Sequence, residues 1–291
     1  MIERILSLVI VGILQGSVYG LLAMGLSLQY GVCRVLNIAH GEFVMLGAVL
    51  TYMLSTGFDV NPLLAPVILG PVLFAIGFLL QATLFRALKA RAPSPAVFEG
   101  SALLAAFGAL YVIQYIARIS FGSTLMPSYY LAQRVSFLGM DFVLNQFVTF
   151  GIALALGIAV YIFLNRSRTG RAVRATAEDP GTAGLMGVNT NMILAFSFGL
   201  GALLAGVAGT LISTKTAVST GIGFSNTVIA LIVVVLGGLG SIPGSFVAGI
   251  VIGIVSMLVA GLWEPVLTVP IYYAMLMILL LVRPTGILGK K

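Results

Sequence analysis

Long apolar runs are the feature that most constrains how this chain can fold. Nine of them, separated by short polar stretches, lie at about residues 5–30, 43–57, 63–85, 101–117, 142–164, 192–213, 226–238, 244–262 and 266–282. A helix needs about 20 mainly apolar residues to cross a bilayer. Runs such as ALIVVVLGG and MLMILLLV do not alternate in the way that the strands of a membrane β-barrel do. The sequence therefore predicts an all-α, polytopic helical membrane protein.

The composition supports a lipid environment for most of the chain. Of its 291 residues, 60% are hydrophobic and only 8% are charged, whereas a soluble globular domain carries about 25% charged residues. The runs at 43–57 and 226–238 are short for a full span. We therefore expect eight or nine transmembrane spans, arranged as a single transmembrane domain over residues 1–291.

The basic residues predict an orientation in the membrane. Cytoplasmic loops carry an excess of Lys and Arg, and 11 of the 15 basic residues lie at Arg34, in 86–91, in 166–174 and at the C-terminal end. Alternating the nine runs places all four groups on one side, with the N-terminus outside and the C-terminus in the cytoplasm. The net charge of +7 is thus spread over short loops and forms no basic face for nucleic acid.

A polar stretch, VLNIAHGEFVML at 35–46, lies between the first two apolar runs. It contains Asn37, His40, Gly41 and Glu42. A charged group at the bilayer centre costs roughly 2.5–3.5 kcal/mol on insertion scales, so it usually faces a cavity or a partner. Glycines flank the stretch and favour a discontinuous helix near 31–42. The alternative is a cytoplasmic turn in which Arg34 and His40 lie among the lipid headgroups and Asn37 caps the next helix.

A second interruption, VLGGLGSIPGSFVAG at 235–249, contains Gly237, Gly238, Gly240 and Ser241. Interruptions rich in Gly and Pro at matching places in two halves of a chain are typical of transport sites built from discontinuous helices. We therefore expect a second break near 237–244, although a tight turn explains these glycines equally well. Glycines also recur every fourth residue at 12, 16 and 20 and at 249 and 253, which predicts close helix packing.

The segment 165–191 is the longest polar stretch on the predicted inner side. Asp179 followed by Pro180 is typical of a helix N-cap and first helical position, and Gly187 is placed to end that short helix. Leu185 and Met186 would then be apolar residues in water. A solvated connector would explain the arginines of this segment but not its caps and apolar tip, so we expect a docking site for another protein.

Motifs of catalysis and nucleotide binding are missing from the sequence. It contains no G-x-x-x-x-G-K-[ST] stretch for ATP phosphates and no H-E-x-x-H or G-x-S-x-G motif. A single histidine and a single cysteine leave no metal cluster and no catalytic triad. We expect a chain that is not an enzyme. If ATP drives transport, another subunit must hydrolyse it.

Three motifs occur together in the order of a known family: GLSLQYGV with NIAHGEF, GRAVRATAEDP with MGVN, and VLGGLGSIPG. With them and the C-terminal RPTGILG, the sequence resembles the permeases of ABC importers for branched-chain amino acids, of the H-subunit type, over essentially the whole chain. The resemblance implies a multi-pass subunit of the bacterial inner membrane with no cofactor of its own. It also implies a second homologous permease, two cytoplasmic ATPases that bind ATP and Mg, and a soluble substrate-binding protein.

The resemblance also implies roles for particular residues. The segment 165–191 would couple to the ATPases through Arg171, Arg174, Glu178, Asp179, Leu185, Met186 and Gly187. The substrate pathway would be lined by Asn37, His40, Gly41, Glu42, Gly237, Gly238, Gly240 and Ser241. Substrate would enter a cavity open to the outside, and ATP binding and hydrolysis would move the coupling segment and reopen the cavity inward, so both sites bias one equilibrium.

Three other functions remain open at this point. Relatives with similar motifs carry urea or short amides, so an ABC permease for these compounds is the nearest alternative. A proton-coupled secondary transporter would use His40 and Glu42 as a relay, although Glu42 and Glu264 are the only candidate intramembrane carboxylates. An intramembrane enzyme would need paired catalytic groups that the sequence does not provide.

Overall fold

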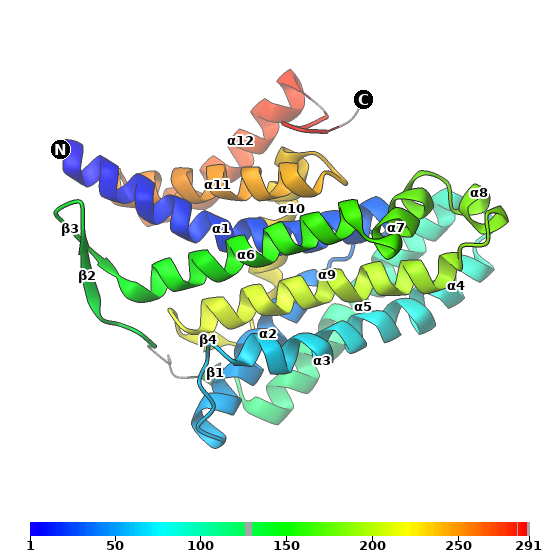
Figure 1. Cartoon of the computed structure of the whole chain (residues 1–291), viewed down its shortest axis with the longest axis horizontal. Helices are drawn as coiled ribbons and strands as arrows, with labels where there is room; N and C mark the ends of the chain where they lie inside the picture. Colours follow the sequence, from blue (N-terminus) through cyan, green and yellow to red (C-terminus); the bar gives the residue numbers. More distant parts are fainter. Residues whose placement is uncertain (126–129, 284, 290–291) are drawn as a thin grey trace.

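The computed structural model describes residues 1–125, 130–283 and 285–289, and this part of the chain is mostly helical (Figure 1). The helices are α1 (Ile2–Cys33), α2 (His40–Gly57), α3 (Ala65–Leu80), α4 (Arg86–Arg91), α5 (Pro95–Phe121), α6 (Leu144–Arg166), α7 (Arg168–Glu178), α8 (Pro180–Leu185), α9 (Thr190–Ser213), α10 (Ile222–Gly237), α11 (Ile242–Leu262) and α12 (Thr268–Val282). A π-helical turn (Gln81–Phe85) joins α3 to α4, and a 3-10 turn (Pro265–Leu267) precedes α12. The predicted fold class is confirmed.

Seven helical segments in the described residues are long and apolar enough to cross a membrane: Ile2–Cys33, Ala65–Arg91, Pro95–Phe121, Leu144–Arg166, Thr190–Ser213, Ile242–Leu262 and Pro265–Val282. This count is below the eight or nine spans expected. The difference lies in α2, with 18 residues, and α10, with 16, which are the two segments that the sequence marked as short.

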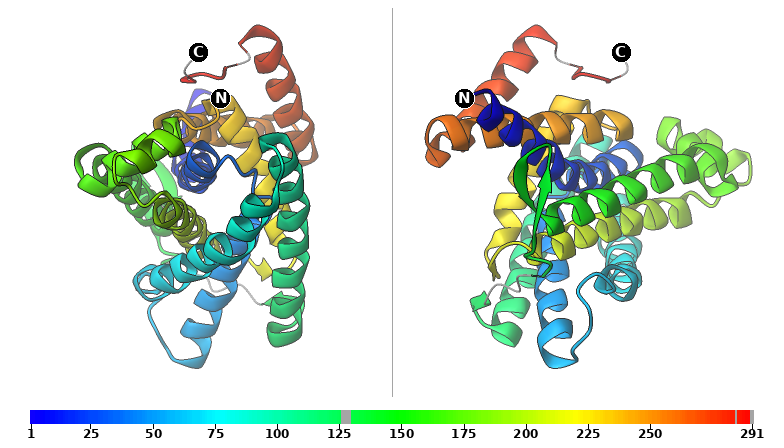
Figure 2. Two further views of the ribbon diagram at one scale, coloured as in Figure 1. Left: turned by 90° about the vertical axis from the view of Figure 1, so that its right-hand side faces the viewer. Right: turned by 60° about the vertical axis from the view of Figure 1, so that its left-hand side comes forward.

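Helices α1 and α9 form the centre of the bundle, and α11, α3 and α2 pack against them (Figures 1 and 2). The predicted glycine stripes account for the closest of these contacts. A methyl group added at Gly16 would collide with the backbone of Gly249 and Ile250, and one added at Gly253 would collide with Gly12 and Gly16. In lipid no hydrophobic force drives helices together, so close approach of their backbones supplies the packing energy.

In the described residues, four short strands lie in the connections between the helices. β2 (Arg134–Phe137) and β3 (Met140–Val143) form an antiparallel hairpin, and β1 (Thr124–Leu125) pairs antiparallel with β4 (Val218–Ser219). The hairpin lies at the end of the molecule that carries the N-terminus, whereas α7 and α8 lie at the opposite end (Figure 1). The two ends of the bundle therefore carry different elements, and residues 165–191 project from the end opposite the hairpin.

Both predicted helix breaks are present. After α1, Arg34 adopts a left-handed conformation with φ 55°, and residues 35–39 lead back to α2. The His40 ring at the start of α2 bonds to Leu22 of α1, eleven residues before the end of that helix and thus roughly 16 Å from it at 1.5 Å per residue. Helix α2 therefore begins inside the bundle. The second break, between Gly237 and Ile242, separates α10 from α11.

Candidate functional site

His40 is fully buried at the start of α2 and is held on both sides of its ring. Its Nε2 atom lies 3.0 Å from the backbone carbonyl oxygen of Leu22, and a neutral imidazole has a single N–H to donate. Its Nδ1 atom lies 3.0 Å from Oε1 of Gln29. The alternative in which His40 lies among the lipid headgroups is therefore wrong, because α1 encloses this ring within the bundle.

Gln29 of α1 joins three parts of the fold. Its Oε1 atom accepts from Nδ2 of Asn37 at 3.2 Å, and its Nε2 atom donates to the carbonyl oxygen of Phe198 in α9 at 3.0 Å. Asn37 in turn accepts from the backbone N–H of Ala39 at 3.1 Å. Ala39 is the N-cap residue of α2, and no side chain among the described residues caps this helix, so the alternative role of Asn37 as its cap is also wrong. Gln29 holds the returning segment between α1 and α9.

Gly41 brings the start of α2 against the start of α10. Its backbone N–H donates to Oγ1 of Thr227 at 2.8 Å, and the same hydroxyl donates to the carbonyl oxygen of Ile38 at 2.9 Å. A methyl group added at Gly41 would collide with the carbonyl oxygen of Gly223 and with Thr227. Only glycine permits this approach of the two helices.

Glu42 is fully buried, and neither of its carboxylate oxygens has a hydrogen-bond partner among the described residues. The carboxylate lies directly against Gly223, where even a methyl group would collide with it. A buried carboxylate without partners is strongly unfavourable, and such groups inside membrane proteins are usually functional. Glu42 is therefore the strongest candidate for contact with a polar ligand.

The glycine segment after α10 is placed differently from the polar stretch. Gly238 and Gly240 have φ values of 101° and 83°, which favour glycine, and Ser241 caps α11 by accepting from the N–H of Gly244 at 3.3 Å. Gly237 accepts from the N–H of Leu288 at 3.1 Å. Close contact with the first break is made by Gly240, which lies beside Gly31. The geometry matches the tight-turn alternative for these glycines, whereas Asn37 to Glu42 contact α1, α9 and α10.

Residues 165–191 form two short capped helices that project from the bundle. Ser167 caps α7, and Asp179 caps α8 by accepting from the N–H of Gly181 at 2.8 Å. Gly187 follows α8 with φ 84°, as predicted for a residue that ends the helix. Leu185 and Met186 are 90% and 81% exposed. The predicted capped helix with an apolar tip is confirmed.

The charged residues of this segment are all exposed. The guanidinium of Arg174 donates to the carbonyl oxygen of Leu164, and that of Arg171 to the carbonyl oxygen of Arg166 at 3.4 Å, so both fasten α7 to the end of α6. Glu178 ends α7. Hydrogen bonds to Asp179 from the Thr182 hydroxyl, and from the backbone N–H groups of Gly181 and Thr182, lower the pKa of this carboxyl below its ordinary value of 3.8.

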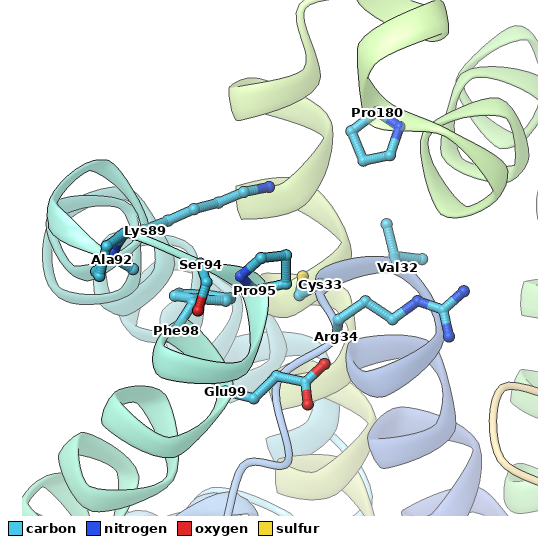
Figure 3. Close-up of a pocket in the computed structure, with 11 residues that line it drawn as sticks. Val32, Cys33, Arg34, Lys89, Ala92, Ser94, Pro95, Phe98, Glu99 and Pro180 are labelled. Carbon is cyan, nitrogen blue, oxygen red and sulfur yellow. The ribbon is translucent and has the colours of Figure 1, made fainter.

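A cavity of about 380 Å³ lies beside the start of α8 (Figure 3). It is lined by Arg34 after the end of α1, by Lys89 of α4, by the α4–α5 link, by Glu99 in the first turns of α5, and by Pro180. A neighbouring cavity of about 310 Å³ also contains Lys89. The sequence indicated neither cavity. The first leaves space between α8 and the α4–α5 link, and the second is lined by the π-helical turn, α4 and the start of α9.

Comparison with known proteins shows which family the chain belongs to. Residues 8–282 match the family described as branched-chain amino acid transport system / permease component. The chain belongs to this family. It is 32% identical, over 96% of its length and 94% of the relative, to the high-affinity branched-chain amino acid transport system permease protein BraD of Pseudomonas aeruginosa. It is 33% identical, with the same coverage, to the corresponding LivH of Escherichia coli. A probable LivH of Methanocaldococcus jannaschii is 29% identical over 85% of this chain and 78% of that protein. No solved structure matches the chain significantly.

Three residues of this permease-family chain hold the buried cluster but were not among the predicted site residues. Gln29 left a signal, because it is an isolated amide near the end of a long apolar run. Thr227 and Gly223 left none, because a threonine and a glycine at the start of an apolar helix are commonplace. Their importance comes from contact with Gly41 and Glu42, which lie more than 180 residues earlier in the chain.

Proposed function

We propose that this chain is the transmembrane permease subunit of an ATP-binding-cassette importer that carries branched-chain amino acids across the bacterial plasma membrane. The observation that carries the proposal is similarity over 96% of the chain to permease proteins of high-affinity branched-chain amino acid transport systems. In this role the chain works with a second homologous permease subunit, two cytoplasmic ATPase subunits that bind ATP and Mg, and a soluble substrate-binding protein.

The segment 165–191 is the coupling element in this proposal. Leu185 and Met186 would enter a hydrophobic recess of an ATPase subunit. A few side chains that become buried at a protein interface usually supply most of its binding energy. Arg171, Arg174, Glu178 and Asp179 would surround that contact, and Gly187 would set the exit of the chain from it. Movement of this segment would be passed to α6 and α9, which flank it in the chain.

The substrate pathway would pass the first helix break. Asn37, His40, Gly41 and Glu42 lie at the buried start of α2, where helices from the two halves of the chain meet. Gly237, Gly238, Gly240 and Ser241 would contribute as a turn that positions α10 and α11. Opening and closing at this level would give alternating access, with ATP binding and hydrolysis in the partner subunits biasing the equilibrium.

The end that carries α7 and α8 would face the cytoplasm, with the N-terminus outside, because most basic residues fall at that end. Site-directed labelling tests this orientation cleanly, since the native Cys33 is buried. A cysteine at the exposed Ala175 should react with a membrane-impermeant maleimide only from the inside. A cysteine at the exposed Phe58 should react only from the outside. The reverse pattern would overturn the orientation.

Reconstitution tests the function itself. The complex is purified through a tag on this chain and placed in liposomes with its binding protein outside and ATP inside. We expect leucine uptake that requires ATP, is abolished in an ATPase variant lacking hydrolysis, and is insensitive to proton ionophores. Uptake by this chain alone that follows a proton gradient would contradict the proposal and favour a relay through His40 and Glu42. Uptake of urea in place of leucine would move the substrate to the amide class.

A further inference from the structure

The starts of α2 and α10 meet inside the bundle and leave two complementary electrostatic features side by side. One is the Glu42 carboxylate, which is completely buried and has no hydrogen-bond partner in the described part of the chain. The other is the N-terminus of α10, which begins at Ile222 after Gly221 and has no side-chain cap. Neither feature is needed for the hydrogen bonds of Gly41 and Thr227 that join the two helices.

We propose that this meeting point binds the zwitterionic head group of an apolar amino acid, with Glu42 pairing with the ammonium group and the α10 N-terminus with the carboxylate. The inference rests on the proposed function and names the contacts that a transported amino acid makes within it. It assigns Glu42 a direct role in substrate binding. It assigns Gly223 the role of letting a carboxylate approach the first turn of α10, where a side chain would collide with it.

The ammonium half follows from the state of Glu42. A buried carboxylate is favourable only when a cation or several hydrogen-bond donors satisfy it, and within the described residues Glu42 forms no ion pair and accepts no hydrogen bond. Its place in the first turn of α2 gives partial compensation through the helix dipole. A ligand cation would complete the pairing. The α-ammonium group of an amino acid has the right charge and three donors.

The carboxylate half follows from the backbone of α10. The first N–H groups of a helix have no partner within it, and together with the helix dipole they form a site for anions. Half-helix N-termini inside membrane transporters bind substrate carboxylates in this way. In this structure the Glu42 carboxylate itself lies against that first turn, at Gly223. A zwitterion would take over this contact with its own carboxylate and bridge back to Glu42 with its ammonium group.

A buried apolar cluster adjoins this meeting point. Met45, three residues after Glu42 and therefore on the same side of α2, belongs to a small buried cluster with Val49, Ala117 and Val218, and Ile222 at the start of α10 packs against it. An aliphatic side chain attached to the zwitterion would extend onto these residues. Urea and short amides offer neither the charges nor the aliphatic side chain, so the site favours an apolar amino acid.

Binding to the assembled complex tests the site without the soluble binding protein. The complex, purified with its partner subunits into nanodiscs, is titrated with radiolabelled leucine. Competitors are 2-hydroxy-4-methylpentanoate, which lacks the ammonium group, and 3-methylbutylamine, which lacks the carboxylate. We expect leucine to bind and each competitor to be at least tenfold weaker. Leucine that fails to bind the wild-type complex, or a hydroxy acid that competes as well as leucine, would overturn the proposal.

Variants identify the residue. Glu42→Gln should weaken leucine binding at least tenfold, Glu42→Asp should recover part of the loss, and Gly223→Ala should weaken binding by obstructing the α10 N-terminus. Glu264→Gln is the matched control, because Glu264 is an exposed carboxylate between α11 and α12. The complex with this variant should bind leucine as tightly as the wild type. Normal binding by Glu42→Gln would overturn the proposal. If Glu42→Gln does not assemble, the competition between leucine and 2-hydroxy-4-methylpentanoate on the wild-type complex tests the proposal in its place.

ATP-driven uptake separates failure of this site from failure of the proposed function. A wild-type complex that imports leucine with ATP, while Glu42→Gln imports it equally well, leaves the importer intact and removes the zwitterion site. A wild-type complex that hydrolyses ATP but imports no leucine removes the proposed function and, with it, this site. Impaired import by Glu42→Gln, partly recovered by Glu42→Asp and not seen with Glu264→Gln, supports both.

Discussion

The two polar segments of this permease-family chain, 34–42 and 165–191, reverse the usual placement of residues in opposite ways. In the first, His40 and Glu42 are polar groups buried among helices, and in the second, Leu185 and Met186 are apolar groups exposed beyond them. Each reversal calls for a partner. The protein itself supplies partners for His40 through Leu22 and Gln29, whereas Glu42 and the α8 tip have none in the described chain.

The two segments also differ in how they are held. The helices of 165–191 are fixed by bonds between near neighbours, such as Ser167 with Gly170 and Asp179 with Gly181. The segment 34–42 is fixed by residues far away in the sequence, such as Phe198 through Gln29 and Thr227 through Gly41. A change in the first segment should therefore act locally, whereas a change in the second should affect the whole bundle.

Substituting one glycine in each segment should show the largest difference in the yield of folded protein. Gly41→Ala places a methyl group against the Gly223 carbonyl and Thr227, and overpacking that the helices cannot relieve should cost about 3 kcal/mol, the upper end of the usual range. We expect almost no monodisperse protein by fluorescence-detected size-exclusion chromatography. Gly184→Ala in α8 meets no atom within 4 Å and should give a wild-type yield. A stable, monodisperse Gly41→Ala protein would contradict the close approach of α2 and α10.

Removing the amide that links α1 to α9 should have the next largest effect. Gln29→Leu leaves the side-chain amide of Asn37 without its acceptor and removes the Gln29 amide from the Phe198 carbonyl and from Nδ1 of His40. A buried polar group left unsatisfied costs about 1–3 kcal/mol. The melting temperature of the purified protein should fall by several degrees, whereas the exposed Gln133→Leu should leave it unchanged. Equal melting temperatures for the two variants would mean that the network contributes nothing to stability.

The sequence predicts the exposed segment better than the buried one because its signals are local. Asp179-Pro180 and Gly187 encode the bounds of α8 within nine residues, and the structure has the cap, the end and the exposed tip where they were expected. The existence of both breaks was also predictable from glycine and polar residues in apolar runs. The position of His40 inside the bundle was not predictable from the sequence. It depends on the contact with Leu22 and on how far residues 35–39 lead the chain back along α1.

The short spans show the same limit. Apolar length alone identified α2 and α10 as short, but not that their starts meet, because the bond between Gly41 and Thr227 joins residues 186 positions apart. The predicted pathway residues around Gly238 were selected by their glycine content. In the structure, positive φ values at Gly238 and Gly240 explain that content as a turn.

The apolar tip of α8 offers a test at the exposed segment. Changing Leu185 and Met186 together to Ser should leave the melting temperature of this chain unchanged, because both side chains are exposed. Affinity for the ATPase subunit should fall about 30-fold, which corresponds to about 2 kcal/mol for the loss of two interface anchors. Titration of the labelled ATPase subunit onto nanodiscs that contain this chain measures this affinity. Val266→Ser, also 81% exposed but outside this segment, is the control. Unchanged affinity of the double variant would remove the docking role.

The cap of α8 should give the smallest effect, and its dependence on pH has a definite sign. Hydrogen bonds from Thr182 and the Gly181 N–H lower the pKa of Asp179 below 3.8, so the ionised carboxylate stabilises α8 at every pH above that value. This stabilisation is lost only as the pH falls through the lowered pKa. Hydrogen exchange of the amides of 181–183, corrected for intrinsic rate, should therefore show constant protection from pH 8 to pH 5.

Substitution of the same residue separates its cap from its charge. Asp179→Asn should keep most of the protection at 181–183, because asparagine caps helices about as well as aspartate, whereas Asp179→Ala should lose it. Neither variant should change exchange at the amides of 40–42, since their bonds to Ala39 and Thr227 are made elsewhere in the fold. Protection that survives in Asp179→Ala would show that contacts other than the cap hold α8. Altered exchange at 40–42 would show that the two segments are coupled even without the ATPase.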